Sequence, residues 1–204
     1  RGTVRCWGGN EDAQLGLGHT NSLAPTDVPT DLLPLSLGGA AVSLTCGARH
    51  TCVVLRGGAV RCWGANDRGQ LGLAHTSAVT NTPANTRPIS LHGPAVSVAS
   101  FGAHTCAVLA GGSAQCWGLN EQGQLGLPHA DDIGDNEHPS STALLTFGSA
   151  VLRVAPGDAH TCAALTGGVL RCWGSNQWGQ LGLAVADSRT GLSTVRTGRE
   201  TGHV

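Results

Sequence analysis

Residues 62–73 read Cys-Trp-Gly-Ala-Asn-Asp-Arg-Gly-Gln-Leu-Gly-Leu, and this stretch decides the fold because it recurs along the chain. Close copies begin at Cys6, Cys116 and Cys172, so the steps from one Cys to the next are 56, 54 and 56 residues. A fixed period of roughly 50 residues is typical of arrays of stacked supersecondary units. The sequence therefore predicts an array of one unit.

The composition is that of a folded, turn-rich chain. Of 204 residues, 40% are hydrophobic and 31 are Gly, whereas disordered chains are poorer in apolar residues and richer in charge. Lys and Arg number 12 against 13 Asp and Glu, which gives no basic footprint for nucleic acid or an anionic membrane surface. No apolar run reaches the length of a bilayer span. We therefore expect no nucleic-acid partner and no membrane span in this segment.

Both ends of the chain interrupt a unit. Arg1 lies in the middle of the first repeat, and the run Thr201-Gly202-His203-Val204 is similar to the residues that precede Cys52. We therefore expect the remaining blades of a longer chain. The alternative is a short chain that closes a ring by joining two half-units.

Residues 96–127 show the pattern of one unit. Residues 96–99 alternate in polarity, residues 104–109 form a second β-rich run that ends at a Gly pair, and residues 113–117 form a third. Such runs are typical of antiparallel strands, and no apolar period of 3.6 residues indicates a helix. The Gly-rich turn that follows is expected to lead into a short outer strand. The fold class is thus predicted to be all-β, with the four-stranded antiparallel blades of a β-propeller.

We expect one partial propeller over residues 1–204, an open arc of about four blade equivalents. Its Trp residues at the repeat position should fill the space between neighbouring blades, each burying on the order of 200 Å². These residues are Trp7, Trp63, Trp117 and Trp173. The expected boundaries are a half-blade at 1–37, blades at 38–92, 93–147 and 148–190, and a half-blade at 191–204.

Six of the eight Cys form pairs that are ten residues apart with a Gly at the midpoint. The pairs are Cys52 with Cys62, Cys106 with Cys116, and Cys162 with Cys172. A hairpin turn such as Arg56-Gly57-Gly58, with Gly58 in the left-handed region, places the two Cys opposite each other. Opposed residues have Cα atoms about 4.5 to 5.5 Å apart, within the range of about 4.4 to 6.8 Å that disulfides span. The spacing predicts three hairpin disulfides.

Three such disulfides imply an oxidising compartment. We expect an extracellular, periplasmic or cell-surface protein, or a cytoplasmic one if the Cys are reduced. Cys6 has no partner ten residues upstream within the chain, and Cys46 stands where other units have Ser100 or Pro156. Cys46 is either a buried free thiol or pairs with a missing blade.

His50, His104 and His160 each stand two residues before a Cys, which invites comparison with a zinc site. Each unit offers one His and two opposed Cys, and these do not supply four converging ligands. We therefore predict no metal site and no cofactor, and expect these His to form hydrogen bonds within the core or between blades.

The long connections 74–95 and 128–150 lack the repeat pattern, and such loops often carry binding specificity. The second contains Asp131, Asp132, Asp135 and Glu137, which match no established calcium loop. We interpret this segment as a solvated loop available to a partner, with weak cation binding as the alternative. Trp178, in the slot filled by Arg68 and Gln122, is a second possible partner-binding residue, since Trp is enriched at interface hot spots.

Residues 62–72, with the run Gly47-Ala48-Arg49-His50-Thr51 before them, resemble the regulator of chromosome condensation repeat. Four copies in register span the chain, although Ala13 replaces the Gly of the other units and is expected to tighten or distort the first turn. The resemblance implies a seven-bladed β-propeller. The paired Cys and the Ile133-Gly134-Asp135 loop are similar to a bacterial, cysteine-containing secreted or surface branch of the family.

Members of the family differ in function, because sites are grafted onto a shared fold. No nucleophile with a matching base, and no paired carboxylates, occurs once rather than once per repeat, so we predict that the chain is not an enzyme. The predicted function is a non-enzymatic interaction scaffold that binds a protein or glycan through its loops. The alternative, from the family resemblance alone, is a guanine-nucleotide exchange factor-like regulator of a small GTPase. A weaker alternative, a glycan-cleaving propeller, would need carboxylates that converge on the axis.

Overall fold

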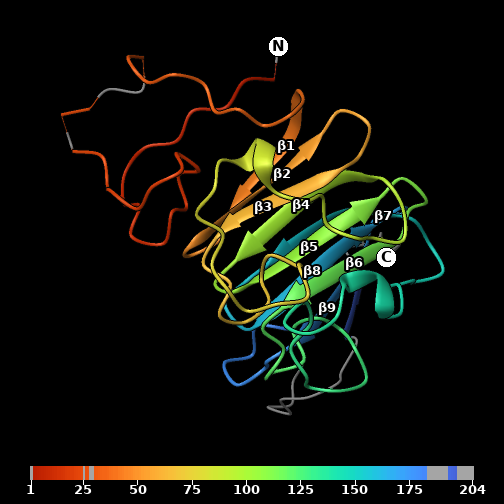
Figure 1. The fold of residues 1–204 in the computed structure, drawn as a ribbon. Helices are drawn as coiled ribbons and strands as arrows, with labels where there is room; N and C mark the ends of the chain where they lie inside the picture. Colours follow the sequence, from red (N-terminus) through yellow and green to blue (C-terminus); the bar gives the residue numbers. More distant parts are fainter. Residues whose placement is uncertain (1, 25, 28–29, 183–192, 197–204) are drawn as a thin grey trace, which may run out of the picture.

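The computed structural model describes residues 2–24, 26–27 and 30–182, and the backbone of 193–196. Three antiparallel sheets follow one another along the chain (Figure 1). The first contains β1 (Ala41–Cys46), β2 (His50–Leu55) and β3 (Val60–Gly64). The second contains β4 (Ala95–Phe101), β5 (His104–Leu109) and β6 (Ala114–Gly118). The third contains β7 (Val151–Pro156), β8 (His160–Leu165), β9 (Val169–Gly174) and β10 (Ser193–Arg196).

Two 3₁₀ turns, η1 (Pro83–Asn85) and η2 (Pro139–Ser141), are the helical segments of the described residues. None of the described helical segments has the length and apolar character needed to cross a membrane. The fold class is all-β, as predicted.

The fourth strand differs among the three sheets. In the third sheet, β10 pairs with β9 from Ser193 opposite Cys172 to Arg196 opposite Val169. In the first two sheets, isolated bridges take its place, and they join Gly64 to Val79, Ala114 to Leu145 and Gly118 to Ile133. Pro83, Pro88 and Pro139 lie in the same connections, and Pro lacks the N–H that a ladder requires. The outer strand is therefore complete in one sheet and reduced to a few backbone contacts in the others.

β10 lies within the range predicted for the following half-blade, 191–204. The rest of that range lies outside the described residues.

The first strands of the three sheets lie side by side. Ser100 N–H on β4 donates to Thr45 Oγ1 on β1 at 2.9 Å, and Val98 N–H donates to Ser43 Oγ at 3.3 Å. β4 in turn contacts β7. These three strands therefore form the inner edge of an arc, with the other strands of each sheet extending outwards from it.

The hydrophobic core lies between the faces of successive sheets. Val98 and Val154 occupy the same position in β4 and β7, and both are buried against the preceding sheet. Leu44 occupies this position in β1 and is 44% exposed. The inner strand of the preceding sheet covers each of these Val side chains. Among the described residues, no equivalent strand precedes β1 to cover Leu44.

The described residues of the range 2–40 contain no named strand, yet they follow the path of a third strand. Leu35 N–H donates to Val4 O at 2.8 Å, as Ile89 N–H does to Val60 O at 2.9 Å. Leu23 N–H donates to the carbonyl of Gly8 at 3.0 Å in the same way. The N-terminal segment thus occupies the outer half of a unit, without a second strand beside it.

Candidate functional site

At each interface between units, one backbone carbonyl of the preceding unit accepts two hydrogen bonds from the next unit. Gln70 O accepts from the indole Nε1–H of Trp117 at 3.0 Å and from the hydroxyl of Thr105 at 3.1 Å. Gln124 O accepts equivalent bonds from Trp173 at 2.9 Å and Thr161 at 2.8 Å. Gln14 O accepts from Trp63 at 2.9 Å and Thr51 at 2.8 Å. Each Trp thereby satisfies its single donor while its ring fills the interface.

The repeat His extends this network. His50 Nε2 lies 2.8 Å from Thr105 Oγ1, and His104 Nε2 lies 3.0 Å from Thr161 Oγ1. Since each Thr hydroxyl gives its one hydrogen to a Gln carbonyl, Nε2 is the donor in both pairs. The structure thus shows the expected interblade hydrogen bond for these two His, while His160 is half-buried.

Burial lowers the pKa of both imidazoles. The pKa of His50 falls to about 4, mainly through loss of solvent and further through the charge of Arg49. The pKa of His104 also falls to about 4, first through burial and then through the charges of His50 and His160. In both rings Nδ1 is buried without a hydrogen-bond partner in the described part of the chain. A proton added there would meet no acceptor, so both His are neutral at physiological pH.

The prediction that Trp7 fills an interblade space was wrong. Trp7 is 58% exposed, whereas Trp63 and Trp117 are fully buried and Trp173 is 2% exposed. The buried three insert beside a Gln of the preceding unit, and no described residue stands in that place for Trp7. Burial of this indole needs the Gln carbonyl of a preceding unit, and the described residues contain no unit before that of Trp7.

The Asn of each repeat fixes the turn that follows the third strand. Asn66 Oδ1 accepts from Leu71 N–H at 3.0 Å, and Asn120 Oδ1 accepts from Leu125 N–H at 3.0 Å. The amide Nδ2 of Asn120 donates to the carbonyls of His129 at 2.8 Å and Asp131 at 3.0 Å. One buried side chain thus holds both the turn and the start of the long loop.

All three predicted disulfides are present. Each joins directly opposed residues of a hairpin, with Cα atoms 4.1, 4.0 and 4.0 Å apart for Cys52–Cys62, Cys106–Cys116 and Cys162–Cys172. These separations are shorter than the range expected from the spacing alone. Gly58 has a φ of +86°, as the turn prediction requires.

The two remaining Cys are free thiols. Cys46 is exposed and Cys6 is half-buried. The interpretation of Cys46 as a buried thiol was therefore wrong. It ends β1 on the face that no further sheet covers.

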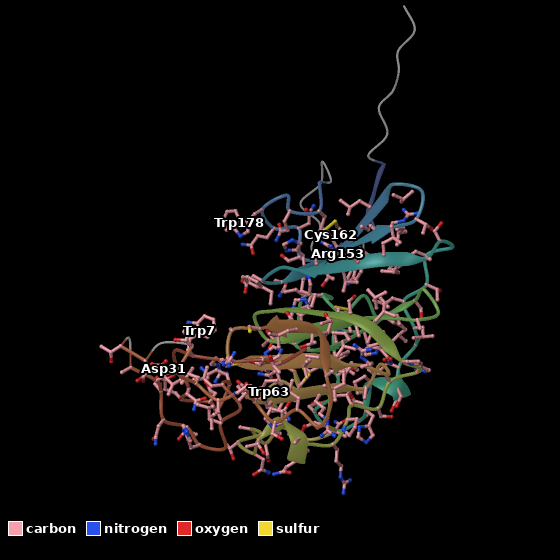
Figure 2. All side chains as sticks on the ribbon, turned by 90° about the horizontal axis from the view of Figure 1, so that it is seen from above. Trp7, Asp31, Trp63, Arg153, Cys162 and Trp178 are labelled. Atoms are coloured by element: carbon pink, nitrogen blue, oxygen red, sulfur yellow. A yellow bond between two sulfur atoms is a disulfide. The ribbon has the colours of Figure 1, made fainter. Side chains whose placement is uncertain are left out.

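The turns and long loops gather at one end of the sheets, which we call the loop face. Cys46 pairs with Thr51 and His50 pairs with Gly64, so the end of β1, the start of β2 and the end of β3 meet there. The second and third sheets have the same register. The loop face comprises residues 47–49, 65–78, 102–103, 119–137, 157–159 and 175–182. Trp7 and Trp178 project on the same side of the molecule (Figure 2).

A pocket of about 650 Å³ opens on the loop face between the second and third units. All four predicted carboxylates line it, and so does the guanidinium of Arg68. These carboxylates are Asp131, Asp132, Asp135 and Glu137. Trp178 does not line this pocket. The structure therefore brings together one part of the predicted partner-binding set and places the other part elsewhere.

The pocket wall is held by hydrogen bonds from within the loop. Asp132 Oδ1 accepts from Asn120 N–H at 2.8 Å, and Glu137 Oε1 accepts from Gly134 N–H at 2.8 Å. Ile133 is buried and bridges to Gly118. The segment interpreted as a solvated loop is therefore exposed at Asp131 but forms a built wall at Asp132 and Ile133.

The wall docks closely on the turn of the preceding unit. Gly69 has a φ of +70°, and a Cβ there would lie 2.5 Å from Asp135 N and 2.6 Å from Gly134 C. Only Gly permits both the left-handed backbone and this approach. The Gly of the repeat therefore sets the distance between the turn and the loop.

Ion pairs of Arg68 cross the same boundary, and an ion pair of Arg49 crosses the boundary between the first and second units. Arg68 lies 2.7 Å from Glu121 and 3.3 Å from Asp132, and its hydrogen bond to Glu121 raises the pKa of Arg68. Arg49 bridges Asp12 at 3.2 Å and Asp67 at 2.8 Å. Because both guanidinium groups are about half exposed to solvent, each pair contributes about 0 to 1 kcal/mol. Their role is to orient charge on the loop face.

Trp178 is presented on a fixed turn. Its N–H donates to Gln180 Oε1 at 2.8 Å, and Gly179 N–H donates to Asn176 O at 3.0 Å. The indole is 85% exposed. The backbone is thus held while the aromatic surface faces solvent. Among the described residues, no group of three or more His, Cys, Asp or Glu is placed to hold a metal ion.

The sequence did not single out the Thr of each Gly-x-x-His-Thr run or the carbonyl of each repeat Gln. Thr105 and Gln70 carry the interblade contacts, together with their counterparts in the other units. Because the Thr and the Gln recur at the same position in every unit, the sequence alone could have indicated that they have a structural role. The ion-pairing Arg49 and Arg68 are not repeated, so only the structure reveals their partners.

The fold and these contacts define a partial β-propeller built from Trp-containing repeats that interlock through a Gln carbonyl. The regulator of chromosome condensation (RCC1) repeat matches residues 1–54, 57–108 and 112–164, and a second form of it matches 41–70, 96–124 and 151–180. The chain belongs to this family.

Three relatives indicate the breadth of the family. The ultraviolet-B receptor UVR8 of Arabidopsis thaliana is 38% identical over 89% of this chain and 40% of its own length. The human probable E3 ubiquitin-protein ligase HERC6 is 32% identical over 96% of this chain and 19% of its own length. The bovine secretion-regulating guanine nucleotide exchange factor is 32% identical over 83% of this chain and 34% of its own length. The chain thus spans less than half of each relative.

Solved structures support the fold. Yeast RCC1 (Prp20), in its complex with Kap60, superposes with a TM-score of 0.74 at 19% identity, covering 98% of this chain and 46% of that one. Human WBSCR16 superposes with a TM-score of 0.69 at 22% identity, covering 90% and 46%. The chain therefore has the architecture of about half of such a propeller chain.

Proposed function

We propose that the chain is a non-enzymatic interaction scaffold that binds a protein partner through its loop face. The observation that carries this proposal is the pocket between the second and third units. Its carboxylates are presented by a loop fixed to Asn120 and docked on Gly69. A surface that is ordered before binding loses less conformational entropy when a partner arrives.

The scaffold supports this proposal chemically. The recurring side chains that could perform acid–base or nucleophilic chemistry take part in structural contacts instead. His50 and His104 are buried in interblade hydrogen bonds, and six Cys are in disulfides. Repeated groups of this kind are explained by folding rather than by one reacting centre.

The three hairpin disulfides support a place in an oxidising compartment. On this proposal the protein is extracellular, periplasmic or attached to the cell surface, as in a secreted or surface branch of the family. Mass spectrometry of protein from its native compartment, alkylated before reduction, tests this placement. Alkylated Cys106 and Cys116 would contradict it.

The binding experiment uses substitutions that keep the local hydrogen bonds. Asp131→Asn, Asp135→Asn and Glu137→Gln remove three of the four carboxylate charges of the pocket but leave an acceptor for Gly134 N–H. Trp178→Gln introduces the residue that stands at the same position in the third repeat, Gln122. The matched control is Arg56→Gln, which lies in a hairpin turn at the opposite end of the first sheet.

Binding is measured by quantitative affinity capture from the native compartment, followed by titration of the purified partner. We expect each loop-face variant to weaken binding about tenfold or more, because interface hot spots contribute about 2 kcal/mol or more. The control should bind like the parent chain. Equal binding by all variants would retire the proposal, and binding of glycans alone, in a parallel glycan-array measurement, would replace the protein partner with a carbohydrate.

A second candidate is a guanine-nucleotide exchange factor-like regulator of a small GTPase. The observation in its favour is the 32% identity to the secretion-regulating exchange factor over 83% of this chain. On this proposal, the chain would accelerate nucleotide release from a GTPase loaded with a fluorescent nucleotide. No acceleration across a panel of small GTPases would retire it.

A further inference from the structure

A second cavity, which we call the outer cavity, lies at the outer edge of the first sheet. Its volume is about 480 Å³, within the range of roughly 300 to 1,000 Å³ that is typical of small-molecule sites. Three apolar and three basic residues line it. The apolar residues are Leu73, Val79 and Pro88, and the basic ones are His75, Arg87 and His138. The outer cavity shares no lining residue with the loop-face pocket.

The outer cavity follows from the interrupted outer strand of the first sheet. The connection from β3 to β4 bonds β3 at two points. Val79 N–H donates to Gly64 O at 2.9 Å, and Ile89 N–H donates to Val60 O at 2.9 Å. Between these points the chain forms η1, and Pro83 and Pro88 have no N–H for a ladder. The cavity lies along this interrupted stretch.

The walls of the outer cavity are fixed by contacts with the units on both sides. Ala84 N–H donates to Ser36 O of the first unit at 2.9 Å, and Ser140 N–H of the third unit donates to Ser90 O at 3.1 Å. Arg61 of β3 donates to Ala84 O at 3.1 Å. The cavity is therefore formed before any ligand binds, within a part of the chain whose neighbouring units the structure describes.

The basic residues of the outer cavity have no acidic neighbour in its lining. Arg87 is exposed and takes part in no ion pair among the described residues. The ring of His75 is oriented by the Asn of the repeat, since Nδ1 of His75 lies 3.3 Å from Nδ2 of Asn66. The charge of the cavity is therefore available to an anion.

The equivalent segment of the third unit has the opposite charge. Val79 corresponds to Ile133, because each bridges to the Gly that follows the repeat Trp. Asn81 of the outer cavity then corresponds to Asp135, which lines the loop-face pocket with three other carboxylates. The same segment of the repeat thus forms two cavities of opposite polarity, which should take different ligands.

We propose that the outer cavity binds a small carboxylate that carries an apolar body, such as a short fatty acid. The carboxylate accepts hydrogen bonds from the guanidinium of Arg87, whose planar donors match its two oxygens, and His138 lies beside it as a further donor. The apolar body lies against Leu73, Val79 and Pro88. This site is separate from the loop-face pocket and does not depend on the function proposed for it.

The test uses hexanoate as the probe and two comparison ligands. Hexanamide keeps the apolar body without the charge, and inorganic phosphate keeps the charge without the apolar body. Each is titrated into the full chain labelled with ¹⁵N, and the backbone amides of Val79, Arg87 and His138 are followed by NMR. We expect saturable shifts with hexanoate and binding at least tenfold weaker for both comparison ligands. No saturable shift at these amides, or binding of either comparison ligand within tenfold of hexanoate, would overturn the proposal.

A matched pair of variants locates the site. Arg87→Gln removes the charge of an exposed side chain but keeps a hydrogen-bond donor, and it should weaken hexanoate binding about fivefold or more. Arg56→Gln removes the same charge in a hairpin turn outside the cavity and should bind like the parent chain. The rest of each spectrum shows that the variant is folded. A smaller loss in Arg87→Gln, or an equal loss in Arg56→Gln, would contradict the assignment of the carboxylate to Arg87.

Discussion

The first repeat and the second carry nearly the same twelve residues but differ in what they bury. Trp7 is 58% exposed and Trp63 is fully buried, although both follow a Cys and precede a Gly. The turn that comes next is the same in both. Leu15 N–H donates to Asn10 Oδ1 at 2.9 Å, and Leu71 N–H donates to Asn66 Oδ1 at 3.0 Å.

This comparison separates two kinds of information in the repeat. The Asn-centred turn is local, so it forms wherever its residues occur. The burial of Trp is not local, because it needs the Gln carbonyl and the core face of the preceding unit. A unit of this propeller is therefore completed by its neighbour, as expected for repeat proteins in which each unit contacts only the next.

The largest expected effect contrasts the two classes of Trp. Trp117→Ala should lower the free energy of unfolding by about 3 to 5 kcal/mol, because it leaves a cavity and removes the donor to Gln70 O. Trp7→Ala should change it by about 0.5 kcal/mol or less, since this side chain is exposed. Urea denaturation of both variants measures the difference. Equal losses would show that the interblade contact does not govern stability.

A smaller contrast concerns the Cys of the same two regions. Replacing Cys106 and Cys116 together with Ala should cost about 2 to 3 kcal/mol, the loop-entropy value for a hairpin disulfide of this separation. Cys6→Ala should cost about 0.5 kcal/mol or less because Cys6 is in no disulfide. Denaturation in non-reducing buffer checks both values. A loss from Cys6→Ala as large as that from the double variant would contradict the assignment.

The buried His give the interblade contacts a pH dependence. The folded-state pKa of His104 is lowered to about 4 from an ordinary value near 6.5. The unfolded chain binds the proton more readily, so stability is fully present above about pH 6.5, declines as the pH falls towards about 4, and then levels off. The loss should be on the order of 3 kcal/mol for this imidazole.

His104→Gln is the matched variant, because the amide can still donate to Thr161 Oγ1. Its free energy of unfolding should fall less steeply between pH 6.5 and pH 4 than that of the parent chain. Identical slopes in urea titrations across this window would remove His104 as the origin of the effect.

The smallest expected effect concerns Ala13, the residue at which the first repeat departs from the Gly of the other repeats. Ala13 has a φ of +62° where the other turns place Gly, and it still accepts from Gly16 N–H at 3.0 Å. The turn expected to be distorted therefore forms, with a strained Ala. Ala13→Gly should stabilise the chain by about 0.5 to 1 kcal/mol, because Gly adopts this conformation without steric cost. Thermal unfolding should show a small rise in the melting temperature, and a fall would contradict this reasoning.

The elements that the sequence predicted well depend on short-range geometry. The opposed Cys of each hairpin follow from a turn of fixed length, and the all-β fold follows from runs bounded by Gly pairs. The exposure of Trp7 and the partial outer strands at Val79 and Ile133 depend on residues 15 or more positions away or on a neighbouring unit. Repetition in a sequence shows that a contact recurs, but not which residues outside the unit complete it.

The candidate site was predictable in composition but not in arrangement. The carboxylates of the 131–137 segment and Trp178 were visible as departures from the repeat. Asp132 turns inward to Asn120 and Arg68, and this depends on the docking of the loop on Gly69. The pocket exists because two successive units meet, so no single unit encodes it.

Exchange of the indole Nε1 protons, followed by NMR in D₂O, tests the central claim most directly. The chain contains five Trp, and each gives its own indole resonance. We predict slow exchange for Trp63, Trp117 and Trp173, which donate to the carbonyl of the preceding unit, and fast exchange for the exposed Trp7 and Trp178. Fast exchange at Trp117, or protection of Trp7 equal to that of Trp63, would contradict the account of units interlocked through a Gln carbonyl.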